Sequence, residues 1–97
     1  MSTAHPRAII LRVHAARRML QRGILMAEVE YVLDHGDEIA TYVDDTPFPS
    51  RLMLGAPSGR PLHVVAADEP AAGITYVITV YEPDPTRWEA DFRRRKS

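Results

Sequence analysis

The chain has 97 residues, of which 45% are hydrophobic and 26% are charged, with a net charge of −1 and no cysteine. These values indicate one globular domain, 1–97, and exclude a disordered chain, disulfide bonds and thiolate metal sites. The N-terminus has no signal-peptide pattern, and no apolar run approaches the roughly 20 residues of a membrane span. We therefore expect a cytoplasmic protein without a membrane partner, with flexible ends at about 1–7 and 94–97.

The charged residues are segregated along the sequence. Residues 1–27 contain five arginines and no acid, whereas residues 28–45 contain seven acids and no lysine or arginine. A further basic run occupies residues 93–96, and eleven of the twelve basic residues are arginine, whose planar guanidinium suits phosphate. The sequence therefore predicts a surface with a basic side and an acidic side.

The N-terminal third predicts a strand followed by two helices. The apolar, β-branched run at 8–13 is typical of a strand, and residues 14–22 have the periodicity of a short helix. Gly23 can end this helix in a left-handed conformation. A second helix is predicted at 26–35 with Gly36 as its C′ residue, although no Ser, Thr or Asp is placed to cap its start.

Each predicted helix has an apolar face that we expect to pack on the core. The apolar face of the first helix consists of Ala15, Ala16, Met19 and Leu20. The apolar face of the second consists of Leu25, Val29, Val32 and Leu33. The other face of the first helix carries four residues that can bind or protonate an anion, namely His14, Arg17, Arg18 and Arg22.

The rest of the chain predicts four strands and a short final helix. Strands are expected at 38–44, 51–55, 61–67 and 74–81, separated by turns. In the last strand, alternation predicts a core face of Ile74, Tyr76, Ile78 and Val80. The other, more polar face consists of Thr75, Val77, Thr79 and Tyr81. Thr86 and Glu89 match a capping box, which predicts a final helix with Trp88 and Phe92 on one side.

The order of these elements predicts the fold class. Four consecutive strands with short links favour an antiparallel meander, and two helices after the first strand would cover one face of it. We therefore expect an α+β fold with two layers, in which two helices cover one face of an antiparallel sheet.

Several motifs along the chain occur together in a known family. The motifs are His14-Ala15-x-x-Arg18-Met19-x-x-Arg22-Gly23-Ile24, Glu28-Val29, Leu33-x-x-Gly36, Pro61-Leu62-His63-Val64-Val65, Val77-Ile78-Thr79-Val80-Tyr81 and Pro83-Asp84-x-x-x-Trp88. Over about residues 9–92 the chain resembles the bacterial family catalogued as domain of unknown function 4258. That family is similar in element order to the RelE, ParE and MqsR toxins. The resemblance implies a RelE-like fold, a toxin-like ribonuclease or a relative that has lost the activity, and a cognate antitoxin as partner.

RNA can be cleaved without a metal by a proton carrier, phosphate-binding cations and a hydroxyl or aromatic group. His14 and His63 are the candidate proton carriers, Arg18 and Arg22 the candidate phosphate ligands, and Tyr81 the remaining catalytic candidate. The candidate RNA contacts are Arg17, Thr79, Arg93, Arg94 and Arg95. The His and acidic residues lack metal-ligand spacing, so we expect neither a metal nor another cofactor. The predicted function is a metal-independent endoribonuclease of the mRNA interferase type, acting on RNA that is free or on the ribosome.

Each candidate also has a structural explanation. Surface arginines are commonly solvated, His14 can act as a polar cap, and a histidine at position 63 is typical of a half-exposed sheet residue. Tyr81 can serve in packing alone. The near-neutral net charge supports an alternative function, a non-catalytic interaction module that binds a protein partner through the acidic region at 28–45. A second copy of the chain is a further candidate partner.

Overall fold

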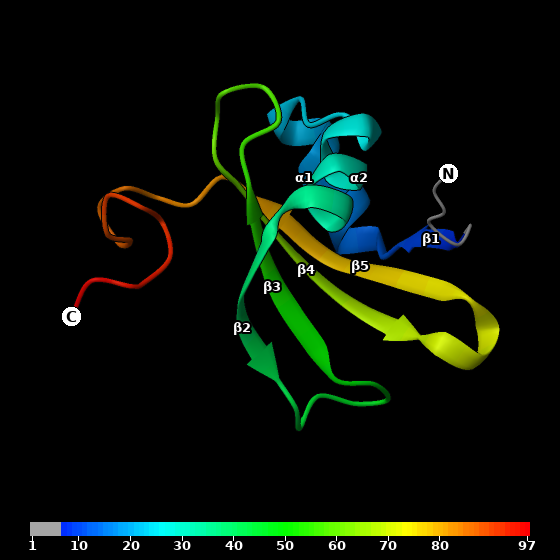
Figure 1. Ribbon diagram of the computed structural model, residues 1–97. Coiled ribbons are helices and arrows are strands. Elements are labelled where there is room, and N and C mark those ends of the chain that lie inside the picture. Colours follow the sequence, from blue (N-terminus) through cyan, green and yellow to red (C-terminus); the bar gives the residue numbers. More distant parts are fainter. Residues whose placement is uncertain (1–6) are drawn as a thin grey trace.

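A computed structural model describes residues 7–97, so the predicted flexible leader lies almost entirely outside the described residues. The elements in chain order (Figure 1) are β1 (Ala8–Leu11), α1 (Val13–Arg22), α2 (Met26–His35), β2 (Asp37–Tyr42), β3 (Ser50–Gly55), β4 (Leu62–Glu69), the short 3-10 helix η1 (Pro70–Ala72) and β5 (Ile74–Tyr81). The bounds of α2 and β5 agree with those predicted from the sequence.

The five strands form one sheet in the order β1-β5-β4-β3-β2. Strands β2 to β5 are the predicted antiparallel meander. Strand β1 pairs in parallel with β5, so the sheet is mixed rather than wholly antiparallel as predicted. The two helices and this open sheet make an α+β fold, which confirms the predicted class.

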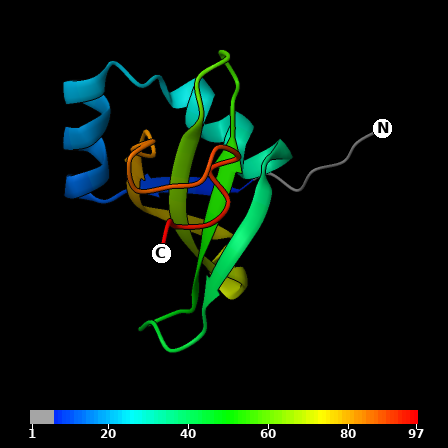
Figure 2. The same ribbon diagram turned by 90° about the vertical axis from the view of Figure 1, so that its left-hand side faces the viewer.

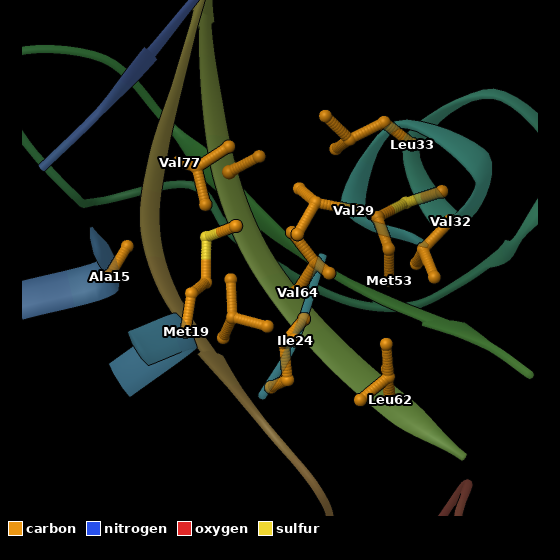
Figure 3. Packing of buried hydrophobic residues seen from close by; sticks show 12 residues of the cluster. Ala15, Met19, Ile24, Val29, Val32, Leu33, Met53, Leu62, Val64 and Val77 are labelled. Carbon is orange, nitrogen blue, oxygen red and sulfur yellow. The ribbon is translucent and has the colours of Figure 1, made fainter. Parts of the chain in front are cut away.

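The hydrophobic core lies between the helices and one face of the sheet (Figure 3). Helix α2 packs on β3 and β4, with Val29 and Val32 near Met53, and α1 packs on β5 through Ala15 and Met19. The apolar face predicted for each helix is too wide, because two further leucines point away from this core. Leu20 is 87% exposed and Leu25 is 65% exposed. We call the opposite side of the sheet the open face.

Strand β5 contains one extra residue relative to β4, which makes a bulge at Ile78. Val77 lies opposite Ala66, whereas Thr79 lies opposite Val65. Val77 and Val80 are three residues apart, yet both are buried under the helices. Strict alternation therefore predicted the faces wrongly before the bulge, where Thr75 and Val77 lie on the helix-covered face and Ile74, Tyr76 and Ile78 do not. After the bulge, the prediction for Thr79, Val80 and Tyr81 is correct.

The two glycines that follow the helices act in different ways. Gly23 ends α1 with φ of 63°, the left-handed conformation that was predicted. Gly36 has φ of −75°, so it is not a left-handed C′ residue. A β-carbon at position 36 would lie 2.5 Å from the carbonyl oxygen of Val32 and 2.6 Å from that of Leu54. Glycine is therefore needed there because α2 runs directly into the sheet.

The start of α2, for which the sequence offers no Ser, Thr or Asp cap, is capped by the buried Glu28 of the helix itself. Glu28 Oε1 accepts a hydrogen bond of 2.9 Å from the backbone N–H of Leu25, and this bond is the main reason that the pKa of Glu28 is lowered. Arg60 lies 3.0 Å from the same carboxylate and also donates to the carbonyl oxygens of Arg22 and Gly23. Arg60 thus joins the end of α1 to the start of α2.

Residues 82–97 form turns, and the predicted final helix is wrong. The carboxylate of Asp84 accepts 2.8 Å hydrogen bonds from both the N–H and the hydroxyl of Thr86, so this hydroxyl does not cap a helix. The N–H of Glu89 instead donates to the carbonyl of Arg94, and Trp88 pairs with Arg95. Figure 2 shows this C-terminal segment, orange to red, crossing the open face of the sheet.

Candidate functional site

Three of the candidate catalytic residues line one pocket of about 350 Å³, where α1 passes the end of β5. Arg18 and Arg22 come from α1, and Tyr81 is the last residue of β5. The stretch from Glu82 to Pro85 closes the pocket on the other side. We call this the arginine pocket.

The packing of α1 explains why its arginines reach this position. Ala15 and Met19 face the core, so the neighbouring flank of the helix lies along the edge of the open face. Figure 2 shows α1 beside the sheet, flanking β5 instead of lying across its centre. Arg18 and Arg22 are one turn apart on this flank, and side chains at that spacing project in the same direction. Two guanidiniums that project toward the same pocket can both donate hydrogen bonds to one phosphate group.

Tyr81 is held by His63, which lies opposite it on β4. The Tyr81 hydroxyl is 3.1 Å from His63 Nδ1, and His63 Nε2 is 2.9 Å from the carbonyl oxygen of Phe92. A carbonyl oxygen can only accept, so Nε2 carries the hydrogen and Nδ1 accepts the hydroxyl proton of Tyr81. The remaining lone pairs of the Tyr81 oxygen are then free for another partner.

His63 is fully buried. The structural explanation offered from the sequence, a half-exposed sheet residue, is therefore wrong. Its ring meets Trp88 edge-on with centroids 4.5 Å apart. Burial lowers the pKa of His63, with a smaller opposing effect of the hydrogen bond to Phe92. Burial likewise raises the pKa of Tyr81. Both groups are therefore neutral near pH 7, and His63 is placed to orient Tyr81 and to anchor the C-terminal segment.

His14 is exposed and lines a neighbouring pocket, not the arginine pocket. That neighbouring pocket also contains Arg12 and Tyr76. His14 lies one helical turn before Arg18, which is about 6 Å along the helix axis. The structure therefore places the imidazole and the two guanidiniums in adjacent pockets along the same flank of α1.

The candidate RNA contacts are dispersed. Arg17 is exposed on α1 outside the arginine pocket, and Thr79 is half-buried on the open face. Arg93 forms an exposed ion pair with Asp37 at 2.5 Å. Arg94 and Arg95 line a separate hollow of the C-terminal segment, where the guanidinium of Arg95 lies 5.6 Å from the centre of the Trp88 ring.

Two acidic residues of the arginine pocket were not found from the sequence. Glu82 and Asp84 belong to the Pro-rich stretch that follows β5, in which Pro83 and Asp84 were noted only as part of a family motif. Arg60 lies 3.7 Å from Glu82. Within residues 7–97, none of the ion pairs involves Arg18 or Arg22. The pocket is thus mixed in charge, and its two arginines are available to an added anion.

No group of three or more His, Asp or Glu residues within 7–97 is arranged to hold a metal ion. The helices described for the chain are all too short and too polar to cross a membrane.

The family model described as domain of unknown function (DUF4258) matches residues 11–82. The chain belongs to this family. The resemblance inferred from the motifs is therefore confirmed, while the RelE-like part of it stays a prediction. In this DUF4258 protein the matched region includes both helices, strands β2 to β5 and the residues Arg18, Arg22, His63 and Tyr81. Searches among curated proteins and among solved structures found no match.

Proposed function

We propose that this protein is a metal-independent endoribonuclease of the toxin–antitoxin type that acts in the cytoplasm. The observation that carries the proposal is the position of Arg18 and Arg22 beside Tyr81 in one pocket, with Tyr81 oriented by the buried His63. Two guanidiniums can bind the cleaved phosphate and stabilise the extra negative charge of its transition state.

The proposed reaction needs only the RNA and groups of this chain. The 2′-oxygen forms a bond to the adjacent phosphorus, the bond to the 5′-oxygen breaks, and a 2′,3′-cyclic phosphate and a 5′-hydroxyl remain. His14 accepts the proton of the 2′-hydroxyl, because it is exposed and one turn from Arg18. The leaving 5′-oxygen takes a proton from water. The Tyr81 oxygen, whose own proton is directed to His63, accepts hydrogen bonds from the arginines and holds them on the phosphate.

The test is a cleavage assay on RNA with the purified protein and its variants. Arg18→Ala and Arg22→Ala are each expected to reduce the rate about 100-fold, because each removes a charged donor from the transition state. Arg17→Ala is the comparison on the same helix, and a loss of only a few-fold is expected because this residue lies outside the pocket. A chelator should leave the rate unchanged.

Two results would contradict the proposal. One is wild-type protein that leaves RNA intact under conditions in which circular dichroism shows it folded. The other is equal loss of activity in the Arg17 and Arg18 variants, because general electrostatic attraction would then explain the effect. Expression in a bacterial host should arrest growth, and Arg18→Ala should relieve the arrest.

A second candidate function is a protein-interaction module, and the exposed apolar side chains at α1 favour it. Leu20 is 87% exposed, Val13 71% and Leu25 65%. A neutral partner surface would pack on these exposed side chains. The region at 28–45 is less suited to bind a partner through its acids, because Glu28 and Asp34 already pair with Arg60 and Arg7. An antitoxin could occupy the same surface, so this candidate is compatible with the first.

The interaction function is tested by purifying the tagged protein from its own cells. A stoichiometric partner should be retained by the wild type and by Gln21→Asp, and it should be lost from Leu20→Asp. The Gln21 substitution adds the same charge at a neighbouring exposed position of α1. A wild-type chain that always purifies alone would contradict this second candidate.

A further inference from the structure

A second pocket, adjacent to the arginine pocket, has a volume of about 440 Å³. Residues from four parts of the chain line it: the start of α1, the loop between β2 and β3, strand β4 and strand β5. The side chains that matter here are Arg12, His14, Asp45, Phe48 and Tyr76. His14 lies one turn of α1 before Arg18, which lines the arginine pocket. A ligand longer than one nucleoside could therefore reach both pockets.

The walls of this second pocket present flat groups. The rings of Phe48 and Tyr76 are nearly parallel, with an angle of 9° between their planes and 6.4 Å between their centres. The guanidinium of Arg12 lies 4.9 Å from the centre of the Tyr76 ring. The Tyr76 hydroxyl donates a 2.8 Å hydrogen bond to Glu69, which fixes the orientation of the ring. Aromatic rings and guanidinium planes of this kind bind unpaired nucleobases by stacking.

The acidic group of the pocket is the carboxylate of Asp45. Its Oδ2 accepts a 2.5 Å hydrogen bond from the hydroxyl of Ser50, a buried residue, and this bond orients the side chain. Oδ1 has no hydrogen-bond partner among residues 7–97. A carboxylate accepts hydrogen bonds from the N–H groups of bases. Guanine offers two adjacent N–H donors on its Watson–Crick edge, and no other RNA base offers such a pair.

We propose that this pocket binds the base of the nucleotide whose 3′-phosphate is cleaved, and that it prefers guanine. The inference rests on the proposed function, which places that phosphate on Arg18 and Arg22. A base stacked against Phe48 and Tyr76, with its phosphate in the arginine pocket, leaves the ribose beside His14. The 2′-hydroxyl then lies next to the group that accepts its proton.

The test is an NMR titration of the full-length protein with guanosine, adenosine, cytidine and uridine. Nucleosides carry no phosphate, so the titration reports on the base pocket independently of Arg18 and Arg22. Guanosine should shift the backbone amide signals of residues 45, 46, 48 and 76 and should bind more tightly than the other three. Phe48→Leu and Asp45→Asn should each weaken guanosine binding about tenfold, because one removes the stacking face and the other the charged acceptor.

The matched control is Asp44→Asn, which removes the same charge at the neighbouring exposed position, outside the pocket. This variant should bind guanosine like the wild type. Absence of shifts with every nucleoside, or unchanged binding by Phe48→Leu, would overturn the base pocket. Equal binding of all four nucleosides would overturn the guanine preference.

The same measurements separate this inference from the proposed function. Guanosine binding by a protein that leaves RNA intact would support the base pocket and contradict the nuclease. RNA cleavage that depends on Arg18, without any nucleoside binding, would support the nuclease and overturn the base pocket.

Discussion

The Tyr81 hydroxyl donates to Nδ1 of His63 across a distance of 3.1 Å, and the other ring nitrogen of His63 donates to the Phe92 carbonyl. One buried imidazole therefore joins β4, β5 and the C-terminal segment. The bond from Tyr81 requires the neutral ring, because a protonated Nδ1 can no longer accept from the hydroxyl. The protonation of one residue is thus linked to the stability of three parts of the chain.

The free energy of unfolding should fall as the solution becomes acidic. Because burial lowers the pKa of His63 in the folded protein below its usual value of 6.5, the unfolded chain binds the proton first. The contribution is fully present above pH 6.5 and is lost as the pH falls from there to the lowered folded pKa, by up to about 1.4 kcal/mol per pH unit. Urea denaturation at a series of pH values measures it.

His63→Gln is the control for this pH dependence, because glutamine can form similar hydrogen bonds but does not titrate. The variant should be less stable overall and should lack the decline just below pH 6.5. The pKa of Glu28 is also lowered, but from 4.5, so its effect on stability belongs to a more acidic range. An unchanged decline in the variant would show that another group is responsible.

Trp88→Ala should destabilise the protein by about 3 kcal/mol, because a large buried ring is removed from its contact with His63. Hydrogen exchange should become faster for the backbone amides of Glu89, Phe92 and Lys96, which donate to carbonyl oxygens across the turn. Arg94→Ala changes an exposed residue of the same segment and should have little effect. Equal exchange rates in wild type and Trp88→Ala would mean that the segment is held by other contacts.

Glu28→Ala should cost about 2 kcal/mol, because the start of α2 loses its cap and Arg60 loses its charged partner. Glu30→Ala alters an exposed acid on the same helix and should change the free energy of unfolding by less than about 0.5 kcal/mol. Chemical denaturation of the two variants gives the comparison. A similar loss in both would indicate a general effect of negative charge near the helix start.

Gly36→Ala and Gly23→Ala should differ in cost for a geometric reason. At position 36 a β-carbon would overlap two carbonyl oxygens, so the backbone must shift and we expect a loss above about 3 kcal/mol. At position 23 nothing lies within 4 Å, and only the left-handed conformation is unfavourable, at about 1 kcal/mol. Thermal unfolding followed by circular dichroism measures both, and a reversed order would contradict the close approach at Gly36.

Local patterns in the sequence were sufficient for most of the fold. The periodicity of residues 26–35 and the β-branched run of residues 74–81 gave correct bounds, because each element is uniform over its length. The bulge at Ile78 left no such pattern, since it depends on how β5 pairs with β4. The capping-box pattern at Thr86 failed because Asp84, two residues earlier, forms a competing local bond.

The candidate site was predictable where residues share one element. Arg18 and Arg22 could be placed together from their helical spacing. Their meeting with Tyr81 was a hypothesis, since it depends on tertiary packing of α1 against β5. The position of Asp45 and Phe48 in the second pocket could not be inferred, because an irregular loop brings them to the sheet and no spacing in the sequence indicates it.

The additional residue in β5 also determines the distance between Tyr76 and Tyr81. Tyr76 and Tyr81 belong to different pockets, and Ile78 lies between them as the one residue that the opposite strand does not match. Omitting it would leave Val77 and Val80 under the helices and both tyrosines on the open side, because regular alternation then gives the same faces. The two tyrosines would come nearer by about 3.3 Å, and the second pocket would lose Ile78 from its wall. The bulge therefore sets the separation of the two pockets along β5. A variant that lacks the extra residue tests whether one ligand spans both of them.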